Sequence, residues 1–161
     1  MLTHPEFDVL AVISVHAPSF PLPAGCPANL VIPDEVENRM KMKDLPPIFE
    51  GGSLPLADSK TPRPNAAVDF TIESSRKFSK SNRLIVLAIG AGTHVASAIL
   101  KDPTIVDRIR VFGMAFKNWA DGGEEYNVLN DVKAWQVMLQ SDVPVVVGIG
   151  DVARAATRVL S

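Results

Sequence analysis

The sequence predicts an α/β fold, a Rossmann-like, mainly parallel sheet flanked by helices. Short apolar runs alternate with helical segments along the chain, which is the pattern of βαβ units. The strand segments are apolar throughout, which is typical of parallel strands buried on both faces. Two of them end in Gly-x-Gly turns that lead into helices, at residues 90–92 and 148–150. We therefore expect a sheet covered by helices on both faces.

The first part of the chain predicts few regular elements. A β-branched run at 8–15 predicts a strand, and Pro33 followed by two acids predicts a short helix over 33–42. Residues 47–49 predict a short strand. Ten of the 13 prolines lie between residues 18 and 64, so this region should be largely loop.

The second part is denser in regular structure. Asn65 predicts the N-cap of a helix that runs to Lys80, with Val68, Ile72 and Phe78 on its apolar side. The other predicted elements are strands at 83–89, 110–115 and 143–147, helices at 93–100, 131–140 and 151–160, a short helical turn that starts at 102–103, and a polar loop at 116–125. On the 131–140 helix, we expect Val132, Trp135, Val137, Met138 and Leu139 to point mostly inward.

Composition limits the possible partners. The 161 residues suit a single domain, 1–161, with a net charge of −2, which provides no basic field for nucleic acid or an anionic membrane. The single cysteine, Cys26, excludes an internal disulfide framework and a multi-cysteine metal site. No apolar run approaches the length of a membrane span, and no signal peptide is visible. A cytoplasmic protein with a small-molecule substrate, and possibly a homo-oligomer, is the expectation.

Ligands of parallel sheets bind beyond the carboxyl ends of the strands, so the loops there hold the candidate residues. The richest is 118–131, whose amides and carboxylates could bind sugar hydroxyls. Its polar residues include Glu124, Glu125, Asn127, Asn130 and Asp131. The alternative interpretation is a solvated loop in which Asn130 or Asp131 caps the next helix.

Other candidates have structural alternatives. The two Gly-x-Gly turns could hold a phosphate at a helix N-terminus, or simply allow close packing of helix and sheet. His16 is the best of three histidines, because it ends the first strand at the ligand edge; His4 and His94 have no such placement. Cys26 has no nucleophile signature around it. Trp119 and Tyr126 could stack on a base, whereas Trp135 suits the core.

Four segments, in order, resemble the inosine/uridine-preferring nucleoside hydrolases. HPEFDVLAVISVHA (4–17) is similar to that family's second strand, and RLIVLAIGAGTHVASAILKDP (83–103) to its strand, G-x-x-T-N turn and helix. GEEYNVLNDVKAW (123–135) resembles its E-F-N segment, and VPVVVGIGDV (143–152) a later apolar strand. The resemblance is weakest from residue 18 to 63.

The resemblance implies hydrolysis of N-ribosides to base and ribose at a calcium ion that holds the ribose hydroxyls and the attacking water. Thr93 matches the threonine whose backbone carbonyl binds calcium. Glu125 and Asn127 match the ribose-binding pair. Asn118 matches another ribose-contacting asparagine, and Met114 a methionine beneath the sugar.

The chain departs from the family at its metal site. The N-terminal D-x-D-x-G-x-D-D-like cluster has no counterpart, and the later calcium aspartate would lie beyond Ser161. His16-Ala17-Pro18 replaces a Gly-Asn pair, and His94 stands where Asn is usual. We therefore expect a truncated, incomplete nucleoside hydrolase fold that is inactive and binds no calcium on its own. The alternatives are a non-catalytic ribose-binding or interaction module and a dinucleotide-binding domain.

Overall fold

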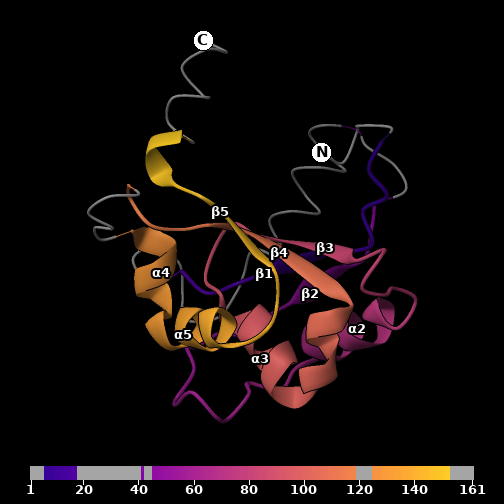
Figure 1. Cartoon of the computed structure of the whole chain (residues 1–161), viewed down its shortest axis with the longest axis horizontal. Helices are drawn as coiled ribbons and strands as arrows, with labels where there is room; N and C mark the ends of the chain where they lie inside the picture. Colours follow the sequence, from indigo (N-terminus) through magenta and orange to yellow (C-terminus); the bar gives the residue numbers. More distant parts are fainter. Residues whose placement is uncertain (1–5, 18–40, 42–44, 119–124, 153–161) are drawn as a thin grey trace.

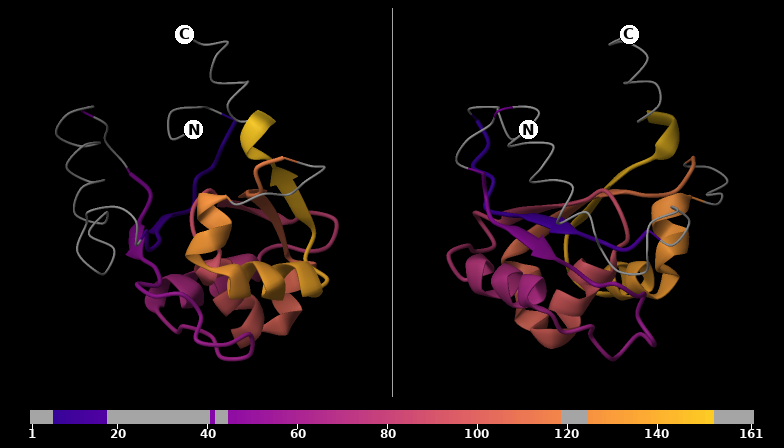
Figure 2. Two further views of the ribbon diagram at one scale, coloured as in Figure 1. Left: turned by 90° about the vertical axis from the view of Figure 1, so that its left-hand side faces the viewer. Right: turned by 180° about the vertical axis from the view of Figure 1, so that it is seen from behind.

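A computed structural model describes residues 6–17, 41, 45–118 and 125–152. Within them, two parallel sheets lie over a layer of helices that gathers on one side (Figures 1 and 2). This arrangement confirms the predicted α/β class with parallel strands. The predicted helix at 33–42 lies outside the described residues except for Lys41, and so does most of the predicted helix at 151–160.

The smaller sheet pairs β1 (Val12–Ser14) with β2 (Ile48–Glu50), and Val12 lies opposite Ile48. The first strand is much shorter than the predicted 8–15. Gly51 follows β2 and donates its N–H to the Ser14 carbonyl at 3.0 Å. A Cβ on residue 51 would lie 2.2 Å from that same oxygen, so only glycine allows this approach.

The larger sheet has the order β3–β4–β5, with all neighbours parallel. Its strands are β3 (Leu84–Ala88), β4 (Ile109–Met114) and β5 (Val145–Gly148). These bounds agree with the predicted strands to within one or two residues. The continuous apolar runs therefore located the strands correctly.

Helix α2 (Ala66–Ser75) begins as predicted, with the Asn65 side chain accepting the Val68 N–H at 3.0 Å. It ends five residues before the predicted Lys80. The Phe78 N–H bonds to the Ser75 carbonyl, and Ser79 bridges to Asn82, so the chain turns back toward β3 instead of extending the helix.

The core lies between the larger sheet and its helices, α3 (Thr93–Lys101) and α5 (Val132–Gln140), with the 3-10 helix η2 (Pro103–Asp107) beside them. Trp135 is 2% exposed, which confirms its predicted core position. On the same helix, the prediction was wrong for Val132 and Leu139, which are exposed. They lie on the side of α5 that faces away from the sheet.

Within the described residues, helices cover the larger sheet on one face only, whereas we expected helices on both faces. Ile85, Leu87, Phe112 and Val146, on the face away from α3 and α5, are 48%, 40%, 36% and 45% exposed. The connections β3–α3–β4 and β4–α5–β5 cross the sheet in one direction. Because such connections are right-handed, both helices fall on the same face (Figure 2).

Candidate active site

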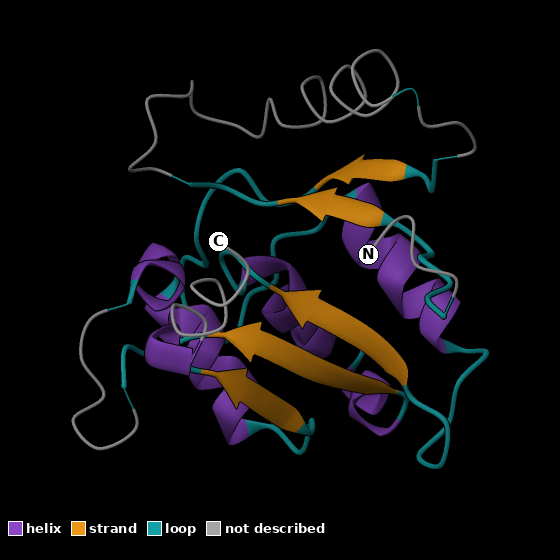
Figure 3. Ribbon diagram, turned by 90° about the horizontal axis from the view of Figure 1, so that it is seen from above, coloured by secondary structure: helices purple, strands orange, loops and turns teal. Residues whose placement is uncertain are grey.

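The strands of both sheets point to one side, and α4 (Tyr126–Asn130) lies beyond their ends (Figure 3). This edge is where the sequence placed the ligand. The two sheets also meet here, since a Cβ on Gly90 after β3 would lie 2.6 Å from Cγ2 of Val15 after β1. The edge therefore gathers the segments that follow β1, β2, β3 and β4.

Asn127 lies on a short helix and Glu125 directly precedes it, whereas the sequence placed both on a loop that ran to Asp131. Glu125 is the N-cap of α4, and one of its carboxylate oxygens accepts the N–H groups of Asn127 and Val128 at 3.0 and 3.2 Å. The alternation of polar and apolar residues at 125–130 is too short to show a helical period, so the pattern gave no signal of α4.

Asn127 is buried, at 7% exposure, and two further hydrogen bonds fix its position. Its side-chain amide donates to the Met114 carbonyl at the end of β4, at 3.0 Å. Its own carbonyl accepts the Trp135 indole N–H at 3.4 Å. Asn127 and Met114, which the sequence predicted separately, are thus brought together.

Asn118 follows β4 by four residues and is half-buried, as is Met114. It is the last described residue before 119–124, which hold Glu124 and Trp119. Tyr126, the other candidate for stacking, is 36% exposed on α4.

Thr93 and Asp131 are buried at this edge and contact each other. The Thr93 hydroxyl donates to the Asp131 carboxylate, which also accepts the Leu56 N–H at 2.8 Å and the Ala134 N–H at 2.9 Å. Asp131 is 3% exposed and caps α5, so Asp131 rather than Asn130 is the helix cap. Its carboxylate joins α3, α5 and the segment after β2.

The described residues do not fit a calcium site. Ca²⁺ takes six to eight oxygens, including several carboxylates. No group of three or more His, Cys, Asp or Glu residues in the described chain could hold a metal. Both oxygens of Asp131 already accept hydrogen bonds. Thr93 is the first residue of α3, where the carbonyl normally accepts the N–H four residues on.

Two histidines are buried, in different places. His16, at 4% exposure, lies at this edge, with its ring nitrogens near two carbonyl oxygens. His94 instead faces α2, where its Nε2 lies 2.9 Å from the Thr71 hydroxyl. Burial lowers the pKa of His94 to about 4. His4 and Cys26 lie outside the described residues.

The Gly-x-Gly turn after β3 supports the packing interpretation. A Cβ on Gly92, the N-cap of α3, would lie 2.6 Å from Met138 Cε and 3.5 Å from Trp135 Nε1. The glycine thus lets α3 pack closely on α5. The second turn joins β5 to residues 150–152, which are helical.

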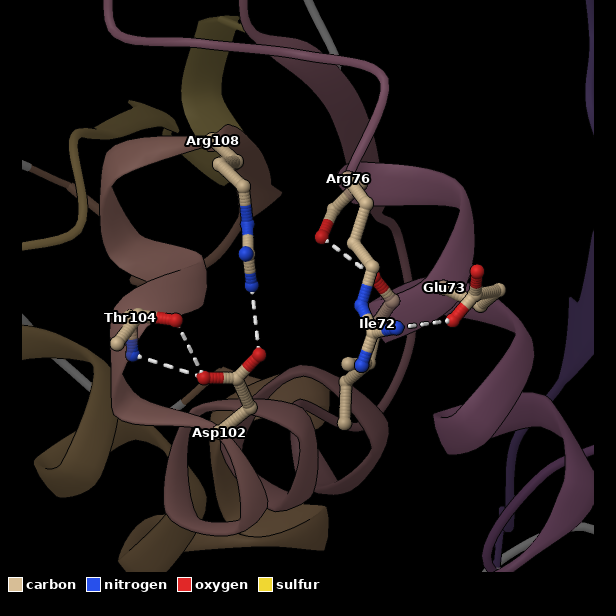
Figure 4. A network of polar contacts seen from close by, with 7 residues as sticks. Ile72, Glu73, Arg76, Asp102, Thr104 and Arg108 are labelled. Carbon is tan, nitrogen blue, oxygen red and sulfur yellow. Dashed lines mark hydrogen bonds and ion pairs between the residues drawn. The ribbon is translucent and has the colours of Figure 1, made fainter.

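A separate polar network lies at the opposite edge, since α3 runs away from the carboxyl ends of the strands. Burial raises the pKa of Asp102, but hydrogen bonds from Thr104 and Arg108 outweigh it and hold the pKa below its usual value (Figure 4). The adjoining groove, of about 630 Å³, has its charges paired, as Lys101 with Asp69 and Arg76 with Glu73. This network stabilises the α3–η2 turn.

None of the helices in the described part of the chain is long and apolar enough to cross a bilayer.

Comparison with known proteins identifies the family. The model of the inosine-uridine preferring nucleoside hydrolases matches residues 1–160. A comparison with curated proteins found no match. Among solved structures, the chain is similar to a purine-preferring ribonucleoside hydrolase from Gardnerella vaginalis, with a TM-score of 0.65 and 19% identity. The match covers 91% of this chain and 54% of that chain, so this chain spans about half its length. The chain belongs to the inosine-uridine preferring nucleoside hydrolase family.

Proposed function

We propose that the chain is a nucleoside hydrolase domain that holds the ribose of a ribonucleoside at the carboxyl edge of its sheets. The reaction is hydrolysis of the N-glycosidic bond, in which water adds to the ribose and the free base leaves. The observation that carries the proposal is the pair Glu125 and Asn127, which are held beside the end of β4 by hydrogen bonds.

The proposed roles follow from the chemistry of hydroxyl groups, which both donate and accept hydrogen bonds. The Glu125 carboxylate would accept from a ribose hydroxyl, and the Asn127 amide oxygen would accept from another. Met114 would lie beneath the sugar, and Asn118 would add a further amide contact. Because Asn127 is already fixed to the Met114 carbonyl, it would bind with little loss of side-chain entropy.

Residues 1–161 on their own should hydrolyse nucleosides slowly or not at all. Hydrolysis needs a group that takes a proton from water. Of the described carboxylates at this edge, Asp131 accepts three hydrogen bonds and Glu125 caps α4. We expect no release of ribose from inosine or uridine above the uncatalysed rate, with or without Ca²⁺. A calcium-stimulated rate would contradict this.

The proposed site would need further oxygen ligands to bind calcium. In a site completed by more carboxylates, the Thr93 carbonyl would be one ligand, and the ion would bind ribose hydroxyls and lower the pKa of its water. For the 161-residue chain, calorimetry with CaCl₂ should show no binding at micromolar concentrations of the ion. Micromolar affinity would show that this chain supplies the ligands itself.

The engaged carboxylates favour a second candidate function, a non-catalytic ribose-binding module. Calorimetry with ribose and with inosine separates the two candidates. A module binds ribose equally well with EDTA or Ca²⁺. A hydrolase site that depends on the ion binds more tightly when Ca²⁺ is present.

Asn127→Ala tests the ribose role directly. We expect the affinity for inosine to fall about three- to tenfold, as for the loss of one hydrogen bond. Asn130→Ala is the matched control on the same helix, because the contact of Asn130 with His16 uses its backbone carbonyl, which the variant keeps. Equal loss of affinity in both variants would contradict the role of Asn127.

A further inference from the structure

His16 connects segments that are far apart in the sequence. It follows β1 by two residues, and its Nδ1 lies 3.2 Å from the carbonyl oxygen of Gly52, after β2. Its Nε2 lies 3.0 Å from the carbonyl oxygen of Asn130, the last residue of α4. One imidazole ring therefore spans the gap between the smaller sheet and the helix that carries the candidate ribose ligands.

The partners of the ring determine its hydrogen bonding. Both are carbonyl oxygens, which only accept hydrogen bonds. A neutral imidazole has one N–H group, whereas an imidazolium has two. Both contacts can therefore be hydrogen bonds at the same time only when both ring nitrogens carry protons. In the neutral form, one nitrogen lone pair would face a carbonyl oxygen in a site that is 4% exposed.

The two contacts are not equivalent. The Gly52 oxygen also accepts the backbone N–H of His16 at 3.2 Å, so it stays bonded when the ring does not donate to it. The Asn130 oxygen has only the ring as its partner outside α4 among the described contacts. The contact with α4 is therefore the one that depends most on the ring.

The elements around the ring bring other ionisable groups. Asp131, after α4, faces Leu56, Thr93 and Ala134. His94, on α3, faces Thr71. Glu50, at the end of β2, has an exposed side chain. The contacts of the ring that carry the connection are those with the two carbonyl oxygens.

The two residues that the His16 ring contacts, Asn130 and Gly52, are both near candidate site residues. Asn130 lies three residues, about one helical turn, after Asn127. At the other end, a Cβ on Gly52 would lie 3.3 Å from Cγ2 of Thr93, so Gly52 packs directly on Thr93. We therefore expect a shift of the ring to move α4 relative to Gly52 and Thr93.

We infer that His16 is a positioning residue that fastens α4 and its Asn127 to the smaller sheet through the contact of its Nε2 with the Asn130 carbonyl. It touches no substrate and acts through the backbone of α4. The inference rests on the proposed ribose role of Asn127 for its functional consequence. The connection itself stands on the contacts of the ring.

The ring spectrum tests the contact with α4. In ¹⁵N-labelled protein, a two-bond ¹H–¹⁵N correlation spectrum shows which ring nitrogens carry a proton. We expect His16 to carry a proton on Nε2, which faces the Asn130 carbonyl, and His94 to show a neutral ring. A His16 ring with no proton on Nε2 would overturn the inference.

His16→Gln tests the connection, because the glutamine amide can donate to one carbonyl but cannot bridge both. Amide exchange of α4 should accelerate about tenfold, and ribose affinity should fall by a similar factor, as for the loss of one buried hydrogen bond. His94→Gln is the matched control, since it changes a buried histidine that faces α2. It should leave α4 exchange and ribose affinity unchanged.

Unchanged α4 exchange in His16→Gln, or an equal change in His94→Gln, would overturn the inference. If the unmodified protein binds neither ribose nor inosine, the proposed function fails, but the ring spectrum and α4 exchange still decide the role of His16. If ribose binds and both His16 readouts are negative, the proposed function stands without this connection.

Discussion

At the scale of single residues, the carboxyl edge is built from polar side chains that serve the fold. Asp131 accepts three hydrogen bonds, Glu125 caps α4 and Asn127 donates to Met114. Buried polar groups are expensive unless they are paired, and here they are paired. The same hydrogen bonds that stabilise the edge also fix the positions of Glu125 and Asn127, the proposed ribose ligands.

Asp131→Ala should destabilise the protein strongly. It removes the acceptor for two N–H groups and one hydroxyl in a site that is 3% exposed, at a cost of about 3 kcal/mol or more. Asp58 is a matched control, because it also accepts three hydrogen bonds, from Lys60 and Thr61, but on the surface. Urea unfolding should show a much smaller effect for Asp58→Ala; similar losses would contradict this interpretation of Asp131.

His94 should make stability depend on pH. Burial lowers its pKa from 6.5 to about 4, so between these values the unfolded chain binds a proton that the folded chain does not. The free energy of unfolding should therefore fall as pH drops from 6.5 to 4, by about 3 kcal/mol in total. Urea unfolding of the protein and of His94→Gln at several pH values measures this. A constant difference between the two across that range would contradict it.

At the scale of elements, glycine sets how closely the helices approach the larger sheet. A Cβ on Gly113, in the middle strand β4, would lie 2.5 Å from the Trp135 ring of α5. The indole is rigid and 2% exposed, so it cannot move aside as a flexible side chain would. The position of α5, and with it Asp131 at its start, depends on this contact.

Gly113→Ala should therefore destabilise the protein by about 2 kcal/mol through overpacking. Gly148→Ala on the neighbouring strand is the control, because the nearest heavy atom to its added Cβ is 3.8 Å away. Its unfolding free energy should stay within about 0.5 kcal/mol of the original. Equal effects of the two substitutions would show that strand propensity, rather than the Trp135 contact, dominates.

At the scale of the whole molecule, the sequence predicted the class and the three strands of the larger sheet, because each strand is a continuous apolar run. Composition could not reveal that the described helices cover the larger sheet on one face, since Ile85 and Leu87 look as buried in the sequence as Val86 does. Which face is covered depends on the direction of the crossovers, which is a property of the topology.

The site was predicted in part for a similar reason. Asn127 and Met114 were predicted from separate segments, and the structure joins them by one hydrogen bond. The short helix α4 and the two carbonyl partners of His16 left no signal in the sequence. His16 is separated from Gly52 by 36 positions and from Asn130 by 114 positions, and no local sequence pattern records contacts over such distances.

The most direct test of the central claim is a ¹H–¹⁵N titration of the protein with inosine that follows the side-chain amide of Asn127. We predict that this signal and the backbone amides of α4 shift first and saturate together, without release of ribose. Saturable shifts confined to other parts of the chain, or no shift at millimolar inosine, would contradict a ribose site at the carboxyl edge of the sheets.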